Sequence, residues 1–254
     1  RASPREAQVR ALALWPDLET RPLGDWVLRR STASNARRAN SVLAMGPSGV
    51  ADDYDRVVEF YAGPPAQRPI AAVLPDSAED ELFRSHGWAP ESNDADTTFQ
   101  IAGVARALRS LRASPTPVDL VETPPVVELV ETPPVVEQGG APAPTGVETP
   151  PGSRQPRSPE PQHATARIGD LASGVAAYDR GWVGFRGIEV SPEHRRQGLG
   201  LEIMAALLEW GAERGATTAY LQVLGDNEPA LALYERLGFT THHSYRYLAR
   251  RESR

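Results

Sequence analysis

Hydrophobic residues recur with strand and helix periods in two segments of the chain, residues 1–112 and 163–254. In the second segment, residues 199–214 carry Leu201, Met204, Ala205 and Leu208 on one face of a predicted amphipathic helix. Short runs of β-forming residues lie before and after it. This pattern predicts strands at 172–178, 182–190 and 217–223, a second helix at 227–237 and one or two closing strands over 239–247.

The first segment has a comparable mixture of patterns. Residues 26–30 resemble the start of a strand, and the apolar spacing over residues 54–61 is helical. Residues 78–86 form a second predicted helix, which Gly87 ends.

A proline-rich stretch over residues 113–162 separates the two segments. Val121-Glu122-Thr123-Pro124-Pro125 recurs at residues 130–134 and again at 147–151. Adjacent prolines exclude a helix, and an acidic, proline-rich composition buries too little apolar surface to offset the entropy of ordering. We expect a disordered linker, with a polyproline stretch that binds a partner as the alternative interpretation.

Composition and charge limit the classes of function. The net charge of −6 excludes a general binder of nucleic acid or anionic membranes, and no apolar run reaches the ~20 residues of a membrane helix. The absence of cysteine excludes disulfides, thiolate zinc sites and a cysteine nucleophile, and it is consistent with a cytoplasmic protein. No signal-peptide pattern is present, and because the sequence begins with Arg1 rather than Met we expect a trimmed start or a fragment. The sequence carries no pattern that indicates an oligomeric state.

One turn in the second segment carries the clearest chemistry. A predicted strand ends near Val190, the turn Arg195-Arg196-Gln197-Gly198-Leu199-Gly200 follows, and a long helix begins. The first amides of a helix lack carbonyl partners and attract anions, and Gly198 and Gly200 allow a pyrophosphate close to the backbone. The alternative is that the two glycines only permit a tight turn.

These residues, with a second motif downstream, resemble a known family. Arg195-x-x-Gly198-x-Gly200 resembles the acetyl-CoA signature of GNAT-type N-acetyltransferases, and residues 188–192 are similar to that family's fourth strand. The run from Asn227 through Tyr234 to Phe239 resembles its second signature. The resemblance implies a mixed central sheet flanked by helices, with acetyl-CoA as acyl donor and a primary amine as acceptor.

The resemblance also implies roles for single residues. The backbone of Ile188, Glu189 and Val190 would bind the pantetheine arm, amides from Arg196 to Leu201 the pyrophosphate, and Asn227 the pantetheine region. The N–H of Val190 would stabilise the oxyanion, and Tyr234 would protonate the leaving thiolate. Tyr234 could instead be a core aromatic residue.

The resemblance does not assign one residue as the general base. Relatives that acetylate protein N-termini carry a glutamate twelve residues before the tyrosine, where this chain has Gln222. Glu189 is the nearest candidate base, with a solvated surface glutamate as the alternative. Its side chain should point opposite to those of Ile188 and Val190, because neighbouring residues of a strand face opposite sides.

The first segment resembles a degenerate copy of the same fold. Residues 82–88 are similar to residues 233–239, but Phe83 stands where the tyrosine would be, and residues 1–112 lack the glycine turn. We therefore expect no productive acetyl-CoA binding there. Arg38, Asn40 and Ser41 are candidates for an acceptor pocket or a domain interface, or for a capped loop.

The sequence thus predicts three parts: a degenerate GNAT-like domain (1–112), a linker (113–162) and a catalytic GNAT domain (163–254). The leading hypothesis is transfer of acetyl from acetyl-CoA to an amine of a small molecule or peptide by direct attack in a ternary complex. The alternative is an acyl-CoA-binding regulatory module without turnover. A scaffold that acts through the linker is a third interpretation.

Overall fold

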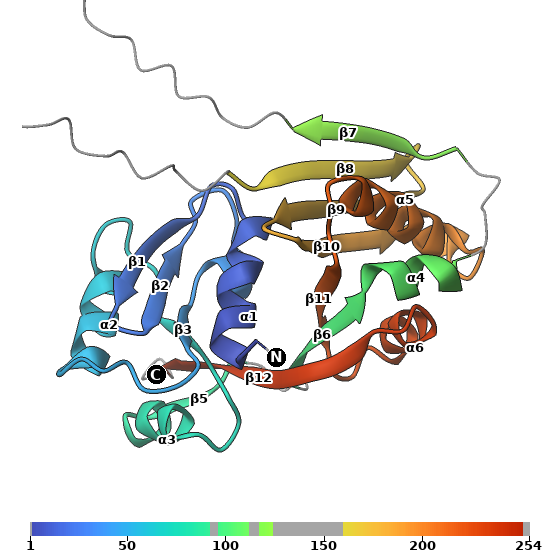
Figure 1. Ribbon diagram of the computed structural model, residues 1–254. Coiled ribbons are helices and arrows are strands. Elements are labelled where there is room, and N and C mark those ends of the chain that lie inside the picture. Colours follow the sequence, from blue (N-terminus) through green and yellow to red (C-terminus); the bar gives the residue numbers. More distant parts are fainter. Residues whose placement is uncertain (1, 92–95, 112–116, 124–159, 251–254) are drawn as a thin grey trace, which may run out of the picture.

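The computed structural model describes residues 2–91, 96–111, 117–123 and 160–250. Its centre is a long mixed sheet with strand order β1-β2-β3-β4-β12-β6-β11-β10-β9-β8-β7, and β5 pairs with β12 (Figure 1). The predicted mixed sheet flanked by helices is confirmed. The first part of the chain contributes α1 (Pro4–Arg10), β1 (Glu19–Leu23), β2 (Trp26–Arg30), β3 (Val42–Ala44), α2 (Asp53–Ala62), β4 (Ile70–Val73), α3 (Ala78–Ser85), β5 (Trp88–Pro90), β6 (Thr97–Gly103) and α4 (Val104–Ser110).

The remaining elements belong to the second part of the chain. They are β7 (Asp119–Thr123), β8 (Gln162–Ile168), β9 (Ala172–Asp179), β10 (Trp182–Val190), α5 (Leu199–Glu213), β11 (Thr218–Leu224), α6 (Glu228–Arg236) and β12 (Thr240–Arg250). Three 3-10 turns, η1 (Ala11–Leu14), η2 (Arg37–Ala39) and η3 (Pro192–His194), complete the described elements. The strands and helices predicted from the sequence are confirmed to within a few residues. None of the helices in the described residues is long and apolar enough to cross a membrane.

The same arrangement of strand, helix and parallel strand occurs in both halves. β3 and β4 are parallel neighbours joined through α2, and β10 and β11 are parallel neighbours joined through α5. The apolar face of α5 packs on the sheet through Ile203, Met204, Leu207 and Leu208, all fully buried. The buried face is displaced around the helix from the predicted stripe, since Leu201 and Ala205 are only partly buried while Ile203 and Leu207 are fully buried.

The two halves share one sheet rather than sitting at the ends of a linker. β6, from the first half, lies between β11 and β12 and is antiparallel to both. β12 continues past β6 to pair with β4 and β5. The opposite sheet face is covered by α1 and η1, where Ala7, Ala11 and Leu14 pack with Phe99 and Tyr220.

The predicted linker boundaries need a correction. Asp119–Thr123 form β7, and β8 begins at Gln162, so both ends of the predicted linker belong to the sheet. A strand pairs by backbone hydrogen bonds, which proline-poor residues such as 119–123 can make whatever the composition around them. Residues 113–116 and 124–159 lie outside the described residues.

Candidate functional site

The site is built on the separation of two parallel strands. β10 pairs with β11 only from Trp182 to Phe185. Beyond Arg186 the pairing of β10 with β9 is irregular, and Gly187 has a φ of 59°, a left-handed conformation that favours glycine. The end of β10 therefore diverges from β11 and leaves an opening between them.

Glycine at position 184 lets the paired part of these strands pack closely. The side chain of Tyr220 on β11 lies over Gly184, and any Cβ at position 184 would lie 2.1 Å from the Tyr220 ring. The Tyr220 hydroxyl donates a hydrogen bond to the carbonyl of Arg10 (3.2 Å). β10 and β11 are thus paired from Trp182 to Phe185 and separate beyond that point.

A groove of about 1250 Å³ occupies the open end. It runs from the end of β10 and the turn before α5 to α6. The structure brings together nearly all the predicted site residues along it: Ile188, Glu189, Val190, Arg195, Arg196, Gly198, Leu199, Gly200, Leu201, Asn227 and Tyr234. Gln197 is the exception, because it does not line the groove and its amide points to the carbonyl of Glu193 (3.5 Å).

The turn before α5 presents free amides to the groove. Arg196 and Gly198 have φ values of 63° and 91°, and no side chain caps the helix. Among the described residues, no acceptor contacts the amides of residues 196–200. The predicted set also included the amide of Leu201, which instead donates to the carbonyl of Gly198 (2.8 Å). Successive free amides at a helix start form a concave anion site.

Val190 lies at the end of β10 and lines the groove. The amide of Ser191 donates to the carbonyl of Leu171 on the β9 side (2.8 Å). Because antiparallel pairs alternate between bonded and non-bonded positions, the N–H and C=O of Val190 point away from β9 and into the opening. Arg195 donates to that carbonyl through Nε (3.3 Å), while no strand among the described residues pairs with the N–H, because β11 pairs with β10 only as far as Phe185.

Tyr234 and Asn227 form the opposite wall. Tyr234 is 8% exposed, and its hydroxyl makes no hydrogen bond to the described residues. Burial raises the pKa of Tyr234, and the nearby charge of Arg38 partly opposes that shift. The hydroxyl is therefore protonated at neutral pH. Asn227 caps α6, since its Oδ1 accepts from the amide of Ala230 (3.3 Å).

The candidate bases are less well placed. Ile188 and Val190 pack against the core beneath α5, whereas Glu189 is exposed, as strand alternation predicts. Gln222 is held through its side-chain oxygen, which accepts from the hydroxyl of Tyr245. Gln222 is thus held in place but is an amide that cannot act as a base, and no partner among the described residues positions the carboxylate of Glu189.

The three candidates from the first half have separate roles. Asn40 accepts from the amide of Ser31 (2.9 Å) and donates to the carbonyl of Ser34 (2.6 Å), so it closes a loop. Ser41 bonds the side chain of Arg29 (2.5 Å). Arg38 alone crosses to the second half, where Nη2 donates to the carbonyl of Gln222 (3.3 Å).

Sequence reasoning missed two cations that line the groove, Arg167 on β8 and Arg236 at the end of α6. Arg236 follows Tyr234 and Glu235 within the second motif, so its position was available as a signal. Arg167 lies in no motif, so nothing in the sequence around it indicated that it would line the groove.

The first half has two pockets, and each contains a carboxylate that already forms a hydrogen bond or an ion pair. The counterpart of the groove, where β3 leads into α2, is a cavity of about 530 Å³ that includes Trp26, Ser48 and Asp53. Asp53 bonds the hydroxyl of Ser48 (2.5 Å) in the first turn of α2, where a carboxylate repels phosphate.

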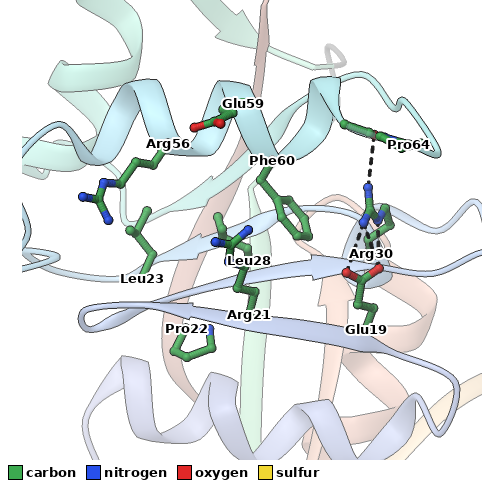
Figure 2. Close-up of a pocket in the computed structure, with 11 residues that line it drawn as sticks. Glu19, Arg21, Pro22, Leu23, Leu28, Arg30, Arg56, Glu59, Phe60 and Pro64 are labelled. Carbon is green, nitrogen blue, oxygen red and sulfur yellow. Dashed lines mark hydrogen bonds and ion pairs between the residues drawn. The ribbon is translucent and has the colours of Figure 1, made fainter.

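The second pocket lies between the β1–β2 hairpin and α2 (Figure 2). Its volume is about 570 Å³. Arg30 stacks on Phe60 and pairs with both carboxylate oxygens of Glu19 (3.0 Å each), so its charge is already neutralised. These features agree with the prediction that the first half does not bind acetyl-CoA productively, which stays a prediction.

Comparisons with known proteins point to one family. Residues 157–248 match the family described as "Probable histone acetyltransferase Rv0428c C-terminal". An uncharacterized N-acetyltransferase of Bacillus subtilis, YobR, is 26% identical over 95% of this chain and 97% of its own length. The streptothricin acetyltransferase of Streptomyces lavendulae is 37% identical over 30% of this chain and 42% of its own length.

Solved structures support the fold over the whole chain. A GCN5-related N-acetyltransferase from Kribbella flavida has a TM-score of 0.62 at 17% identity, and covers 98% of this chain and 95% of its own. A tandem GNAT protein from the clavulanic acid biosynthesis pathway has a TM-score of 0.54 at 16% identity, with coverage of 98% and 88%. With the separated strands and the glycine turn, these matches show that the chain has a GNAT-type fold, and its similarity in sequence to N-acetyltransferases supports an acyltransferase.

Proposed function

We propose that the protein transfers an acetyl group from acetyl-CoA to a primary amine of a small molecule or peptide. One observation carries the proposal: one groove is lined both by the turn residues with free amides, Arg196, Gly198, Leu199 and Gly200, and by Tyr234. The first group suits a pyrophosphate and the second a leaving thiolate. Arg195, Arg196, Arg167 and Arg236 add positive charge to the same groove.

The proposed reaction is a direct attack. The neutral amine forms a C–N bond to the thioester carbonyl, and the C–S bond breaks as the thiolate leaves. Tyr234 donates its proton to the thiolate, and the N–H of Val190 stabilises the negative carbonyl oxygen. The proton released by the amine passes to water or to Glu189, whose exposed position allows exchange with solvent, and Tyr234 regains a proton from solvent before the next turnover.

Two measurements test the proposal in order. Calorimetry with acetyl-CoA should show saturable heat, and its absence at millimolar ligand would exclude the cofactor assignment. Thiol release from acetyl-CoA is then followed across a panel of amines. Release that depends on one amine class supports catalysis and identifies the acceptor.

A non-catalytic acyl-CoA-binding module is the second candidate. Gln222 in place of a carboxylate and the unsupported position of Glu189 favour it. Saturable binding without thiol release for any amine in the panel would select this function over catalysis.

A further inference from the structure

The outermost strand of the sheet is exposed to solvent along its whole length. β7 lies at the edge beyond β8 (Figure 1), and all five of its residues are exposed. Val121 is 61% exposed and Leu120 38%. The antiparallel ladder from Asp119 opposite Arg167 to Thr123 opposite His163 connects β7 to β8.

One side chain of β7 makes specific contacts. Glu122 accepts from Nε1 of Trp210 (3.2 Å) and pairs with the guanidinium of Arg214, both at the end of α5. Leu120 and Glu122 lie opposite the buried residues Ala166 and Ala164, so they share the face that α5 covers. Ahead of the strand, Val118 packs against the core. The contacts at the β8 edge are thus made by a valine and a glutamate four residues apart, with a leucine between them on the face of α5.

The chain carries this pattern twice. Residues 118–123 read Val-Asp-Leu-Val-Glu-Thr, and residues 127–132 read Val-Glu-Leu-Val-Glu-Thr. The single difference, Glu128 for Asp119, conserves a carboxylate at the position of the repeat that lies opposite Arg167 in β7. Every residue that contacts the β8 edge or α5 thus has an equivalent in the second repeat.

The third repeat lacks the pattern. Val147-Glu148-Thr149 is preceded by Pro144, Thr145 and Gly146, which replace the valine, the carboxylate and the leucine. Proline cannot donate to a ladder, and glycine offers no side chain to pack. This repeat is a natural negative control within the same segment.

We propose that the β8 edge, with Trp210 and Arg214, is a binding site for an acidic Val-(Asp/Glu)-Leu-Val-Glu-Thr strand, and that residues 127–132 exchange with β7 at it. The exchange shifts the chain by nine residues. Loop closure depends only on the logarithm of loop length, so shortening the long connection to β8 changes its entropy little. The occupant is the chain's own repeat, because tethering gives it a high effective concentration.

Engineered cysteines test the exchange, since the chain has no cysteine of its own. Val121 lies opposite Thr165 on the face away from α5. We expect Thr165→Cys with Val121→Cys, and Thr165→Cys with Val130→Cys, to form intramolecular disulfides in similar fractions in a glutathione buffer. Thr165→Cys with Val147→Cys is the control, and should form at least tenfold less although residue 147 has the shorter tether to residue 165.

Each other outcome overturns the proposal. A Val130→Cys yield no higher than that of Val147→Cys would restrict the site to β7. Disulfide-linked dimers would assign the site to a second molecule. As an independent readout, Glu122→Ala alone should change Trp210 fluorescence less than Glu122→Ala with Glu131→Ala, because Glu131 can substitute. Equal changes would contradict the exchange.

Discussion

At the scale of the residue, Tyr234 is the group on which turnover depends most directly. Its hydroxyl is unpaired among the described residues and its pKa is raised by burial, so it holds a proton for the leaving thiolate. We expect Tyr234→Phe to lower kcat by about 10²–10⁴, the usual worth of a general acid. The affinity for acetyl-CoA measured by calorimetry should stay within about threefold. An unchanged kcat would leave Tyr234 as a core aromatic residue.

A second residue-scale prediction concerns His243, which is half-buried and stacks on Phe99 (ring centroids 5.0 Å apart). Gln8 bonds its Nε2 (3.1 Å), and its Nδ1 faces Nδ1 of His242 (2.8 Å). Burial, and then the charge of His242, lowers the pKa of His243 to about 4 from 6.5. Below pH 6.5, His243 therefore binds a proton in the unfolded chain, whereas in the folded chain it binds one only near pH 4.

The free energy of unfolding should consequently decline as the pH falls from 6.5 toward 4, by up to about 3 kcal/mol from this residue. Urea denaturation at pH 7 and pH 4.5 checks the expectation. His243→Gln removes the titration, so the variant should lose less stability than the wild type over that interval. Parallel losses in the two proteins would show that other groups dominate.

At the scale of the element, the start of α5 makes the anion site. Gly198 has a φ of 91° at the N-cap, and a Cβ there would meet nothing within 4 Å. Gly198→Ala therefore costs backbone strain without a steric clash, about 1–2 kcal/mol. If the turn relaxes to avoid that strain, the free amides lose their orientation, and we expect acetyl-CoA affinity to fall about tenfold.

Gly215, beyond the other end of α5, is the matched control, with a φ of 84° and equally open space around it. Gly215→Ala should lower the melting temperature by a similar amount and leave the affinity for acetyl-CoA unchanged. Equal losses of affinity in both variants would mean that the effect is on stability rather than on the turn.

Local elements followed from the sequence because their signals are local. The periodicity of residues 199–214 and the glycines that flank them predicted α5 and its turn. The contact of Arg38 with Gln222 and the pairing of β6 with β11 and β12 had no such signal, since each joins residues far apart in the chain. The edge strand β7 was missed because proline-rich composition dominated the window around five residues that pair with β8.

At the scale of the whole molecule, the shared sheet decides how the protein unfolds. Phe99 on β6 is fully buried between Tyr220 and His243, with ring centroids 5.5 and 5.0 Å away. Since β6 is bonded to β11 and β12, and β12 to β4, neither half retains an intact sheet when the other unfolds. We propose that residues 1–112 and 163–254 form one cooperative unit.

Calorimetric unfolding should then show a single transition, with equal calorimetric and van't Hoff enthalpies. Phe99→Ala should destabilise that transition by about 3–5 kcal/mol, the usual cost of removing a buried phenylalanine. A fragment of residues 118–254 lacks β6, so it should show no cooperative transition. Two resolved transitions in the full chain, or cooperative unfolding of the fragment, would establish instead that the second half folds alone and that β6 only docks on it.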